Sequence, residues 1–342
     1  MNSPRQRATM IDVAKDAGVS FKTVSRVLNG ESNVREETRQ LVMSAAARLN
    51  YTLNAAARNL RVGGPQIISL LVQNPSRSYI ESAHLGALQR CHKIGMRLIM
   101  EECEGGLAEI EAMIINSSPV GIVVTPPLCD DPELIKMLDD KKRRYVLIAP
   151  CNPDSARASI NINDEIAAQE MTQHLLSLGH KRIGFIKGHP DHSVSAKRYK
   201  GYSNAMKAAG IDIDPQLIEQ GQFSWASGLA CAEKLLDLPS RPSAVFASND
   251  DMAAAVIAAA YRRNIHVPND LSVVGFDNMQ VAAVISPQLT TVNQPIANMV
   301  SEAVGLLTDQ TFQSGVRSKP IFLDHHLVIR ESAAPANAKV AT

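Results

Sequence analysis

The 342-residue sequence lacks the short motifs that identify most catalytic and nucleotide-binding proteins. It contains no G-x-G-x-x-G, no G-x-x-x-x-G-K-S/T phosphate loop, no G-x-S-x-G nucleophile turn and no H-E-x-x-H pair. His325 and His326 are adjacent in an expected strand, so their rings point to opposite faces and cannot easily share a metal ion. We therefore expect no enzyme, no catalytic residue, no cofactor and no metal site.

Cysteine and long apolar runs are scarce as well. No C-x-x-C spacing occurs, which favours reduced core or surface thiols in a cytoplasmic protein. The five cysteines are Cys91, Cys103, Cys129, Cys151 and Cys231. No apolar run reaches about 18 residues and no signal sequence is present. We expect a cytoplasmic protein that does not contact a membrane.

Net charge is nearly absent, at +1, but the charged residues are unevenly distributed. Residues 1 to 62 contain ten Lys or Arg against five Asp or Glu, whereas the remaining residues contain 25 against 29. A basic head on an acidic body is typical of a chain whose head binds phosphates. The alternative, a small helical cap with solvated charges, does not require this asymmetry.

Two short helices are predicted in the basic head. Thr9 can cap the first helix, with Asp12 completing a capping box, and Gly18 ends it. Ser20 can cap a second helix over residues 21 to 28. Two short helices joined by a glycine-containing turn predict a helix-turn-helix. A third helix, over residues 35 to 50, would brace the pair with an apolar face formed by Leu41, Ala45, Ala46 and Leu49.

The second helix supplies the side chains that we expect to meet DNA. In a helix-turn-helix, the N-terminal side chains of this helix reach base edges in the major groove, which selects Phe21, Lys22 and Arg26. Thr23 and Ser25 could donate hydrogen bonds to phosphates. The full set predicted to contact DNA in the head is Thr9, Ser20, Phe21, Lys22, Thr23, Ser25, Arg26 and Asn29.

Residues 54 to 61, NAAARNLR, form a short segment after the head. Asn54 can cap a helix and the alanines favour one, but eight residues are too few to hold a helix in water unaided. We expect the segment to become ordered only when it docks, with apolar Leu60 beside basic Arg58. An ordinary linker is the alternative, because Gly63-Gly64-Pro65 follows directly.

From residue 65 onward, apolar β-branched runs alternate with helical stretches. Strands are predicted over residues 67–72, 97–101, 121–126, 145–150, 182–188, 243–249 and 271–277. Helices between them include residues 83–94, 165–178, 196–209, 228–238 and 251–263. Continuous apolar strands separated by helices predict parallel sheets covered on both faces, and the length suggests two lobes. Ligands then bind in the cleft where the strand C-termini meet.

Polar and aromatic side chains stand near the ends of several of these strands. They are Ser76, Tyr79, Arg198, Phe223, Asn249 and Asp277. Carboxylate and amide groups, an arginine fork and an aromatic face together suit a small sugar. Structural alternatives exist for single residues: Asp250 can cap the following helix, Phe223 can belong to the core, and Arg198 can form a surface salt bridge.

Three segments of the head carry a family resemblance. DVAKDAGVSFKTVSRVLNG, the V-x-x-x-T-R of residues 34 to 39 and LNYTLNAAARNL resemble the lactose-repressor and galactose-repressor (LacI/GalR) transcription factors. The resemblance is densest over residues 1 to 62 and extends, with weaker motifs, to about Glu331. It implies an N-terminal all-α helix-turn-helix domain, residues 1–62, with a hinge helix at about 54–61. It also implies an α/β, two-lobed, periplasmic-binding-protein-like (type I) effector and dimerisation domain, residues 63–342, with a disordered tail at about 332–342.

The resemblance further implies a function. We expect a homodimeric repressor that binds a palindromic double-stranded DNA operator and leaves it when a small sugar-like effector binds in the cleft. A corepressor, either a purine or a phosphorylated metabolite, is the alternative effector. Two hinge helices would pair in the minor groove and insert Leu60 between base steps. The hinge residues expected to contact DNA are Asn54, Ala57, Arg58 and Leu60.

Residue matches and departures refine this expectation. Arg198, Asn249 and Asp277 match effector-contacting positions of the family. Leu53 replaces the usual hinge proline, which implies looser coupling, and Arg35 replaces a small hydroxyl cap. The C-terminal ESAAPANAKVAT has no leucine heptad, so we expect a dimer and no tetramer.

Two other classes of protein remain open at this point. A binding receptor whose head serves as a tether would be supported by export signals. An enzyme with a regulatory head would be supported by turnover of a ligand bound in the cleft.

Overall fold

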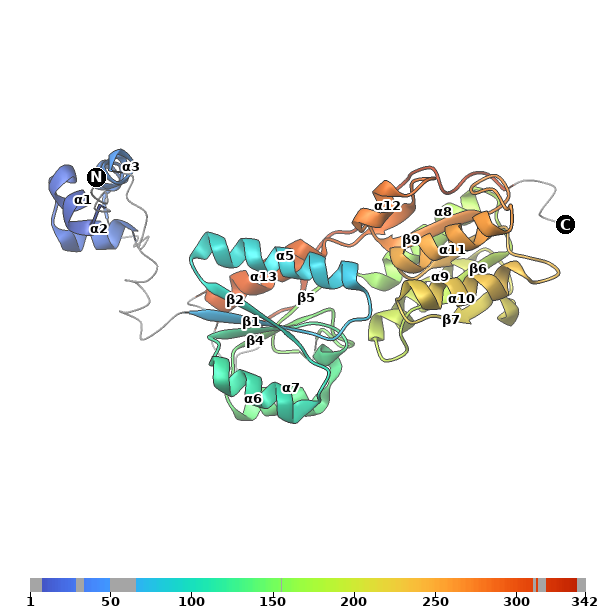
Figure 1. Ribbon diagram of the computed structural model, residues 1–342, viewed down its shortest axis with the longest axis horizontal. Helices are drawn as coiled ribbons and strands as arrows, with labels where there is room; N and C mark the ends of the chain where they lie inside the picture. Colours follow the sequence, from blue (N-terminus) through green and yellow to red (C-terminus); the bar gives the residue numbers. More distant parts are fainter. Residues whose placement is uncertain are drawn as a thin grey trace, which may run out of the picture. The chain divides into compact units, whose positions relative to one another are not determined.

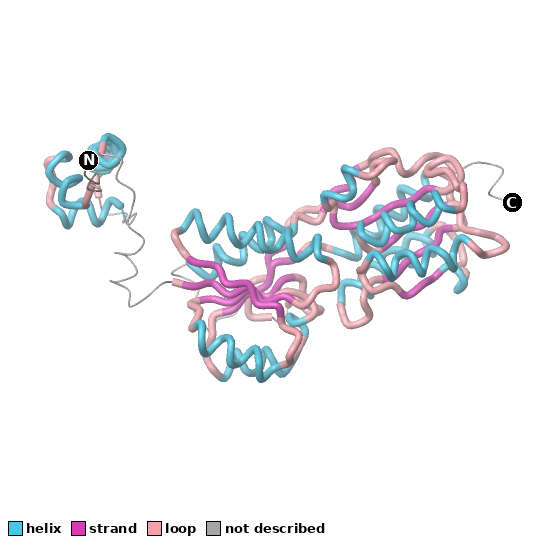
Figure 2. The backbone as a smooth tube through the Cα atoms, in the orientation of Figure 1, coloured by secondary structure: helices cyan, strands magenta, loops and turns pink. Residues whose placement is uncertain are grey.

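The computed structural model describes residues 8–28, 34–49, 66–154, 156–309, 312 and 318–336. The chain divides into two compact units, Met1–Pro65 and Gln66–Thr342, which we call the head and the body. Figure 1 shows the helical head and the mixed body, and Figure 2 separates their helices, strands and loops.

The head contains three described helices, α1 (Met10–Ala17), α2 (Phe21–Leu28) and α3 (Glu36–Arg48). The predicted capping box is confirmed: the Thr9 hydroxyl accepts from the Asp12 backbone N–H, and the Asp12 carboxylate accepts from the Thr9 N–H. Gly18 ends α1 with a left-handed φ of 65°, a conformation that suits glycine. The Ser20 hydroxyl accepts from the Thr23 backbone N–H at 3.1 Å and so caps α2, also as predicted.

A small apolar core holds these helices together, and one residue that was predicted to belong to it does not. Val13 of α1, Val24 and Val27 of α2, and Val42 of α3 are buried with neighbouring alanines. Leu41, predicted to face the core, is 55% exposed instead. Ala45, Ala46 and Val42 share one helical face, because they follow the i, i+3, i+4 spacing, whereas Leu41 lies about 100° away from Val42.

The third helix is also shorter than predicted, since it begins after Arg35 and ends at Arg48. Arg35 occupies the N-cap position and its side chain makes no capping hydrogen bond. Glu36 and Glu37 lie in the first turn, where carboxylates interact favourably with the helix dipole. The Arg48 guanidinium donates to the Asp16 carboxylate through Nε and Nη2, linking α3 to α1.

The body has two lobes, each built on a six-stranded sheet. The first sheet is parallel throughout, in the order β11-β5-β4-β3-β1-β2. The second has the order β12-β10-β9-β8-β6-β7, with only β12 antiparallel to its neighbour. The first-lobe strands are β1 (Ile67–Val72), β2 (Arg97–Glu102), β3 (Gly121–Val124), β4 (Tyr145–Ile148), β5 (Ser159–Asn161) and β11 (Ile321–Phe322). The second-lobe strands are β6 (Ile183–Lys187), β7 (Ile218–Gln220), β8 (Ala244–Ala247), β9 (Ser272–Asp277), β10 (Thr290–Asn293) and β12 (His326–Val328).

Helices cover both faces of each sheet, as continuous apolar strands require. In the first lobe, α5 (Arg77–Ile94) and α13 (Ile296–Thr308) cover one face, and α6 (Leu107–Ser117) and α7 (Pro132–Asp140) the other (Figure 1). In the second lobe, α8 (Asp164–Ser177) packs on α9 (Ser193–Ala208), and α10 (Trp225–Leu236) packs on α11 (Asp250–Arg262). Shorter elements are η1 (Leu128–Asp130), η2 (Pro215–Leu217) and α12 (Gln280–Val284).

Two glycines allow close helix packing beside the cleft. At Gly201 of α9, a β-carbon would collide with the backbone carbonyl of Glu165 in α8. At Gly86 of α5, a β-carbon would collide with the carbonyl of Ala297 in α13. These contacts fix α9 and α5, the two helices whose N-terminal ends carry Arg198 and Tyr79.

The chain passes between the lobes three times, after β5, after β10 and after β11. The seven predicted strands all form, with ends shifted by up to two residues. The strand expected around His325 and His326 forms as β12, which begins at His326. Four further strands, β5, β7, β10 and β11, were not predicted, and none of them exceeds four residues. Runs this short carry too little periodicity to be distinguished from loops.

The predicted disordered tail at about 332–342 begins too early. Ser332 is fully buried, and its hydroxyl donates to the Val273 carbonyl at 2.6 Å. The Ala334 carbonyl accepts from the Ser272 hydroxyl at 3.1 Å, and the Ala336 N–H donates to the Leu178 carbonyl at 2.8 Å. The small polar residues of this segment led to a prediction of disorder, but Ser332, Ala334 and Ala336 form hydrogen bonds with the second lobe.

All five cysteines are free thiols, as predicted, and only Cys151 is exposed. Burial raises the pKa of the Cys91 and Cys231 thiols to about 11 and disfavours thiolate formation. Within the described ranges, no helix is both long and apolar enough to cross a membrane.

Candidate functional site

Arg198 of α9 is the most heavily engaged side chain of the cleft. It is only 3% exposed. Its Nε donates to Asp164 Oδ1 at 2.9 Å, Nη1 to the Ser248 carbonyl at 2.6 Å, and Nη2 to Gln294 Oε1 at 2.9 Å. Nη1 also lies 3.3 Å from Asp277 Oδ1. Arg198 is therefore a buried hub between α8, β8, β9 and the crossover after β10, and the surface salt-bridge alternative is wrong.

The Arg198 guanidinium has little capacity left for a ligand anion. Its carbon lies 3.6 Å from the centre of the Phe276 ring, so one face is covered by an aromatic side chain. Each of its three nitrogens already donates to a protein oxygen. A phosphate or carboxylate would have to displace these partners before it could form a bidentate pair.

Asp277 ends β9 in a strained backbone conformation, with a φ of 105°. Its Oδ1 is buried and, despite the nearby Arg198, has no hydrogen-bond donor among the described residues. Burial raises the pKa of Asp277 to about 7, opposed by Arg198 and reinforced by Asp251 and Asp164. A buried oxygen without a donor is costly unless a ligand or water completes its bonding.

Tyr79 presents a second such atom from the other lobe. The tyrosine is buried on α5, and its hydroxyl has no hydrogen-bond partner among the described residues. Burial is the main cause that raises the pKa of Tyr79 far above its ordinary value, so the phenol stays protonated. Asp277 offers an acceptor and Tyr79 a donor, and both line the same cavity.

All six residues predicted to contact an effector line that one cavity, which we call the inner cavity. They are Ser76, Tyr79, Arg198, Phe223, Asn249 and Asp277. The rest of the wall consists of Asn74, Pro126, Ala149, His192, Val194 and Gln294. The lobes are closed around it, because only about 20 Å³ remains for the centres of water molecules. This volume holds roughly one water.

Asn249 and Phe223 have structural roles beside their place in the wall. Asn249 is the N-cap of α11, where its Oδ1 accepts from the Met252 N–H at 3.0 Å. Its Nδ2 donates to the Phe223 carbonyl at 2.9 Å. The alternative that made Asp250 the N-cap is wrong. Asp250 lies inside α11, and its carboxylate accepts from the backbone N–H of Met279 and the hydroxyl of Thr291.

His192 and Gln294 were not singled out from the sequence. His192 precedes α9 and is 2% exposed, and burial, with smaller effects of His189 and Arg198, lowers its pKa to about 3. Its imidazole is therefore neutral in the cavity wall. His192 follows a predicted strand, which was a usable signal, whereas Gln294 follows β10, which was not predicted.

Side chains from opposite lobes meet on two sides of the inner cavity. The Ser76 hydroxyl donates to Asp251 Oδ2 at 2.8 Å, and the Ser78 hydroxyl donates to Asp251 Oδ1 at 3.1 Å. Elsewhere, Lys197 Nζ donates to the Pro150 carbonyl at 2.8 Å. These bonds join α5 to α11 and α9 to the loop after β4, and they stabilise the closed arrangement.

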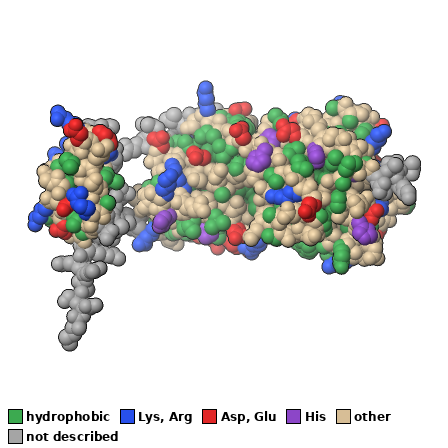
Figure 3. Space-filling view, turned by 90° about the horizontal axis from the view of Figure 1, so that it is seen from above, with side chains coloured by type: hydrophobic (Ala, Val, Ile, Leu, Met, Phe, Trp, Pro, Cys, Tyr) green, Lys and Arg blue, Asp and Glu red, His purple; other side chains and the backbone are tan. Residues whose placement is uncertain are grey.

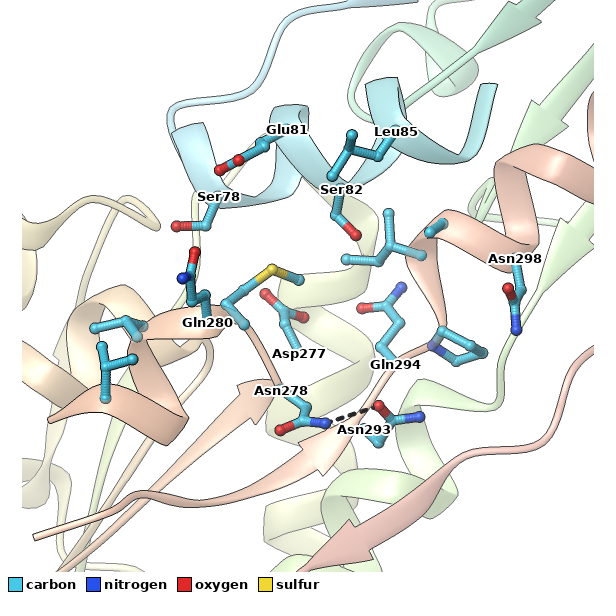
Figure 4. A pocket seen from close by; sticks show the side chains of 16 residues that line it. Ser78, Glu81, Ser82, Leu85, Asp277, Asn278, Gln280, Asn293, Gln294 and Asn298 are labelled. Atoms are coloured by element: carbon cyan, nitrogen blue, oxygen red, sulfur yellow. Dashed lines mark hydrogen bonds between the residues drawn. The ribbon is translucent and has the colours of Figure 1, made fainter. Parts of the chain in front are cut away.

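An open groove of about 610 Å³ lies beyond the Ser78–Asp251 contact (Figure 4). Ser78, Glu81, Ser82 and Leu85 project into it from α5, opposite Asn278 and Gln280. Asn278 Nδ2 donates to Asn293 Oδ1 at 3.0 Å along its floor. The groove shares Asp277 and Gln294 with the inner cavity.

In the head, the predicted DNA-contacting residues gather at the start of α2. Ser20, Phe21 and Lys22 are exposed, and Phe21 is 41% exposed despite being apolar. Thr23, Ser25 and Arg26 are half-buried. The hydroxyls of Ser20 and Thr23 lie 2.9 Å apart, so both take part in the helix cap. Thr9 lies in the α1 capping box.

The remaining residues predicted to contact DNA lie outside the described residues. They are Asn29 in the head, and Asn54, Ala57, Arg58 and Leu60 in the expected hinge. Leu53, which replaces the family's proline, lies outside them as well.

Comparisons with known proteins give matches for both the head and the body. Residues 9–54 match the lacI family of bacterial regulatory proteins, and residues 172–333 match the periplasmic binding protein-like domain. The HTH-type transcriptional repressor PurR of Photobacterium profundum is 32% identical over 336 residues, covering 96% of this chain and 100% of the relative. The likeness therefore includes both the head and the body.

Two solved structures extend the comparison. A complex of the transcriptional regulator CelR with cellobiose is 30% identical, has a TM-score of 0.72, and covers 96% of this chain and 100% of its own. The lac repressor dimer bound to operator and the anti-inducer ONPF has a TM-score of 0.72 at 24% identity, with the same coverage, and shows the fold.

Proposed function

The chain belongs to the LacI family of bacterial regulatory proteins, and we propose that it is a repressor that binds a palindromic operator as a homodimer and releases it when a neutral sugar-like effector binds between the lobes. The observation that carries the effector class is a pair of buried oxygens without a hydrogen bond among the described residues, Asp277 Oδ1 and Tyr79 Oη, beside an Arg198 whose three nitrogens each donate to a protein oxygen. A protein of this family acts in the cytoplasm, and its activity is regulation rather than catalysis.

The charge around the inner cavity disfavours an anionic effector. Asp164 and Asp277 lie beside Arg198, Asp251 acts electrostatically on Asp277, and the neutral imidazole of His192 adds no positive charge. A phosphorylated metabolite would therefore be repelled by carboxylates and would find its arginine already occupied. A hydroxyl-rich neutral ligand can donate to Asp277 and accept from Tyr79 without this penalty.

The head supports DNA reading through the exposed start of α2. Lys22 and the solvent-facing ring of Phe21 occupy positions from which a helix-turn-helix contacts base edges. The polar groups of Thr9, Ser20 and Thr23 support contacts with phosphates. For residues 54 to 61, the proposal rests on sequence alone: two copies pair on the operator, and Leu60 supplies the wedge.

The proposed switch is a change in the populations of two lobe arrangements. The closed arrangement leaves room for about one water in the inner cavity, so a sugar has to favour a more separated one. An effector that binds the second arrangement about a hundredfold more tightly shifts the equilibrium by about 2.7 kcal/mol. That amount is comparable with the stability of a marginal two-turn hinge helix.

An apolar groove on the second lobe supports the homodimer. It has a volume of about 640 Å³ and lies between α10, α11 and the loop after α12. Trp225 and Tyr261 line it and are 45% and 83% exposed, which is unusual for aromatic side chains of a monomer. Figure 3 shows one face of the molecule, on which groups of apolar side chains lie among charges of both signs.

Thermal shift and DNA-binding measurements test the effector class. The full chain is screened against neutral hexoses and disaccharides, hexose phosphates and purine bases, with DNA selected from a random palindromic library. We expect a neutral sugar to raise the Tm and to dissociate the DNA. A response confined to phosphates or purines, with tighter DNA binding, would contradict the proposal and support a corepressor.

The variant Asp277→Ala makes the same screen specific for the inner cavity. We expect it to bind the selected DNA but to lose the response to the neutral sugar. Induction that survives this substitution would remove Asp277 from the effector site.

A further inference from the structure

The inner cavity continues outward into a second polar depression between the lobes, which we call the mouth. The mouth has a volume of about 460 Å³, and Asn74 and His192 belong to both spaces. Arg77 and Glu102 line it from the first lobe, and His189 and Asp191 from the second. Because the inner cavity admits about one water in this closed structure, the mouth is where a ring-sized ligand has room.

A row of three aromatic rings leads from the inner cavity into the mouth. The Phe223 ring, in the inner wall, lies 5.4 Å from His192, and His192 lies 5.2 Å from His189. The first two residues are buried, whereas the side chain of His189 is 28% exposed. Aromatic faces of this kind contact the C–H faces of successive sugar rings.

Polar groups complete the mouth. Arg77 Nη1 donates to Glu102 Oε1 at 2.9 Å across exposed side chains, so a donor fork and a carboxylate stand side by side. His189 Nδ1 accepts from the Asp191 N–H at 3.2 Å, so Nε2 is the ring nitrogen that can donate to a ligand. Adjacent hydroxyls of a sugar can bridge donors and acceptors arranged in this way.

We propose that the mouth is a second carbohydrate subsite, so that the effector has at least two sugar units. Once the lobes separate, the first unit occupies the inner cavity at Asp277 and Tyr79. The second stacks on His189 and exchanges hydrogen bonds with the Arg77–Glu102 pair. This inference rests on the proposed function, because it extends the same effector site.

The groove of Figure 4 is a poorer candidate for the second unit. The Ser76 and Ser78 hydroxyls both bond to Asp251 between the inner cavity and this groove. Among the described residues that line the groove there is also no aromatic side chain on which a sugar ring could stack. The mouth combines an aromatic face with polar groups.

Calorimetric titration of the full chain with hexoses, and with disaccharides that contain them, tests the proposal. We expect a disaccharide to bind at least 10-fold more tightly than its hexose. His189→Ala should weaken the disaccharide by about 3- to 10-fold and leave the hexose unchanged. His92→Ala is the matched control, because His92 is exposed in the last turn of α5, about 22 Å along the helix from Arg77.

The outcomes separate the subsite from the proposed function. Disaccharide binding that His189→Ala leaves unchanged, or equal losses for hexose and disaccharide, would overturn the subsite. A hexose that binds with no gain from a second unit would overturn it as well, while leaving the proposed function intact. If neither hexoses nor disaccharides bind, the proposed function itself fails.

Discussion

Asp277 is the residue whose ionisation we expect to follow effector binding. Its pKa of about 7 means that roughly half of the free protein carries a neutral carboxyl group at that pH. Sugar hydroxyls donate to the ionised form, so binding favours loss of the proton. We predict that effector affinity rises about tenfold between pH 6 and pH 8, measured by calorimetry in buffers of different ionisation enthalpy.

Asp277→Asn provides the comparison for this pH profile. The charged and titratable groups that interact with Asp277 are Arg198, Asp251, Asp164, Asp250 and Tyr79. The substituted amide cannot titrate, so affinity should be lower and flat with pH. A tenfold slope that persists in Asp277→Asn would assign the proton to another group.

Asp277 also gives the free protein a pH-dependent stability of a definite sign. Its folded pKa is raised above the unfolded value of 3.8, so the folded state holds the proton more tightly. Its contribution to stability is fully present below pH 3.8 and is lost as the pH rises through about 7. Without effector, we predict that the Tm difference between Asp277→Asn and the unsubstituted chain grows over this pH window.

At Arg26, a substitution tests whether α2 reads bases. Arg26 lies on the second turn of the predicted recognition helix and is half-buried. Arg26→Ala should weaken binding by about 1–3 kcal/mol at particular base positions of the selected DNA. Binding to a library of single-base variants measures this. Uniform weakening on every sequence would reassign Arg26 to a phosphate.

Residue types were easier to predict than the partners that determine their roles. All six predicted effector residues reach one cavity, because polar groups at strand ends mark the cleft of such a fold. The N-cap of α11 is Asn249 and not Asp250, since either side chain can cap a helix and only the backbone geometry decides between them. The saturation of Arg198 depends on partners from three distant segments, which no local pattern encodes.

At the scale of elements, the cap of α2 determines how well the reading helix is formed. The Ser20 hydroxyl satisfies the Thr23 N–H, and α2 rests on only a small apolar core. Ser20→Ala should destabilise the head by about 1 kcal/mol and increase hydrogen exchange in α2 of the full chain. Ser44→Ala, at an exposed position within α3, serves as the control and should leave exchange unchanged or slightly slower.

The long strands of the body were predicted from the sequence, whereas the shortest strands and the inner face of the third head helix were not. The seven strands predicted in the body contain runs of buried apolar residues, whereas β7 and β11, which were not predicted, have only three and two residues. The third head helix was predicted with Leu41 inward because Ala45 and Leu49 follow it at i+4 and i+8. Ala45 and Ala46 also follow Val42 at i+3 and i+4, and it is Val42 that is buried.

At the scale of the whole body, sequence predicted two lobes and a cleft but could not predict how far the cleft is closed. Closure depends on contacts such as Ser76 with Asp251, which are 175 positions apart in the chain. The size of the inner cavity, and therefore the need for the lobes to separate, follows from these contacts. The mouth was missed for the same reason, since His189, Arg77 and Glu102 come from segments far apart in the chain.

Asp251 is the residue through which the balance between lobe arrangements can be tested. Its carboxylate accepts from Ser76 and Ser78 across the cleft, so Asp251→Ala removes two bonds that exist only in the closed arrangement. If a sugar requires more separated lobes, a smaller closed population raises the apparent effector affinity, by about 3- to 10-fold. Small-angle X-ray scattering should detect a more open free protein, and calorimetry should detect the tighter binding.

Asp212→Ala, which removes an exposed carboxylate from the loop after α9, should change neither quantity. Weaker effector binding by Asp251→Ala, with more open lobes, would mean that the sugar selects the closed arrangement and that the direction of the switch is reversed.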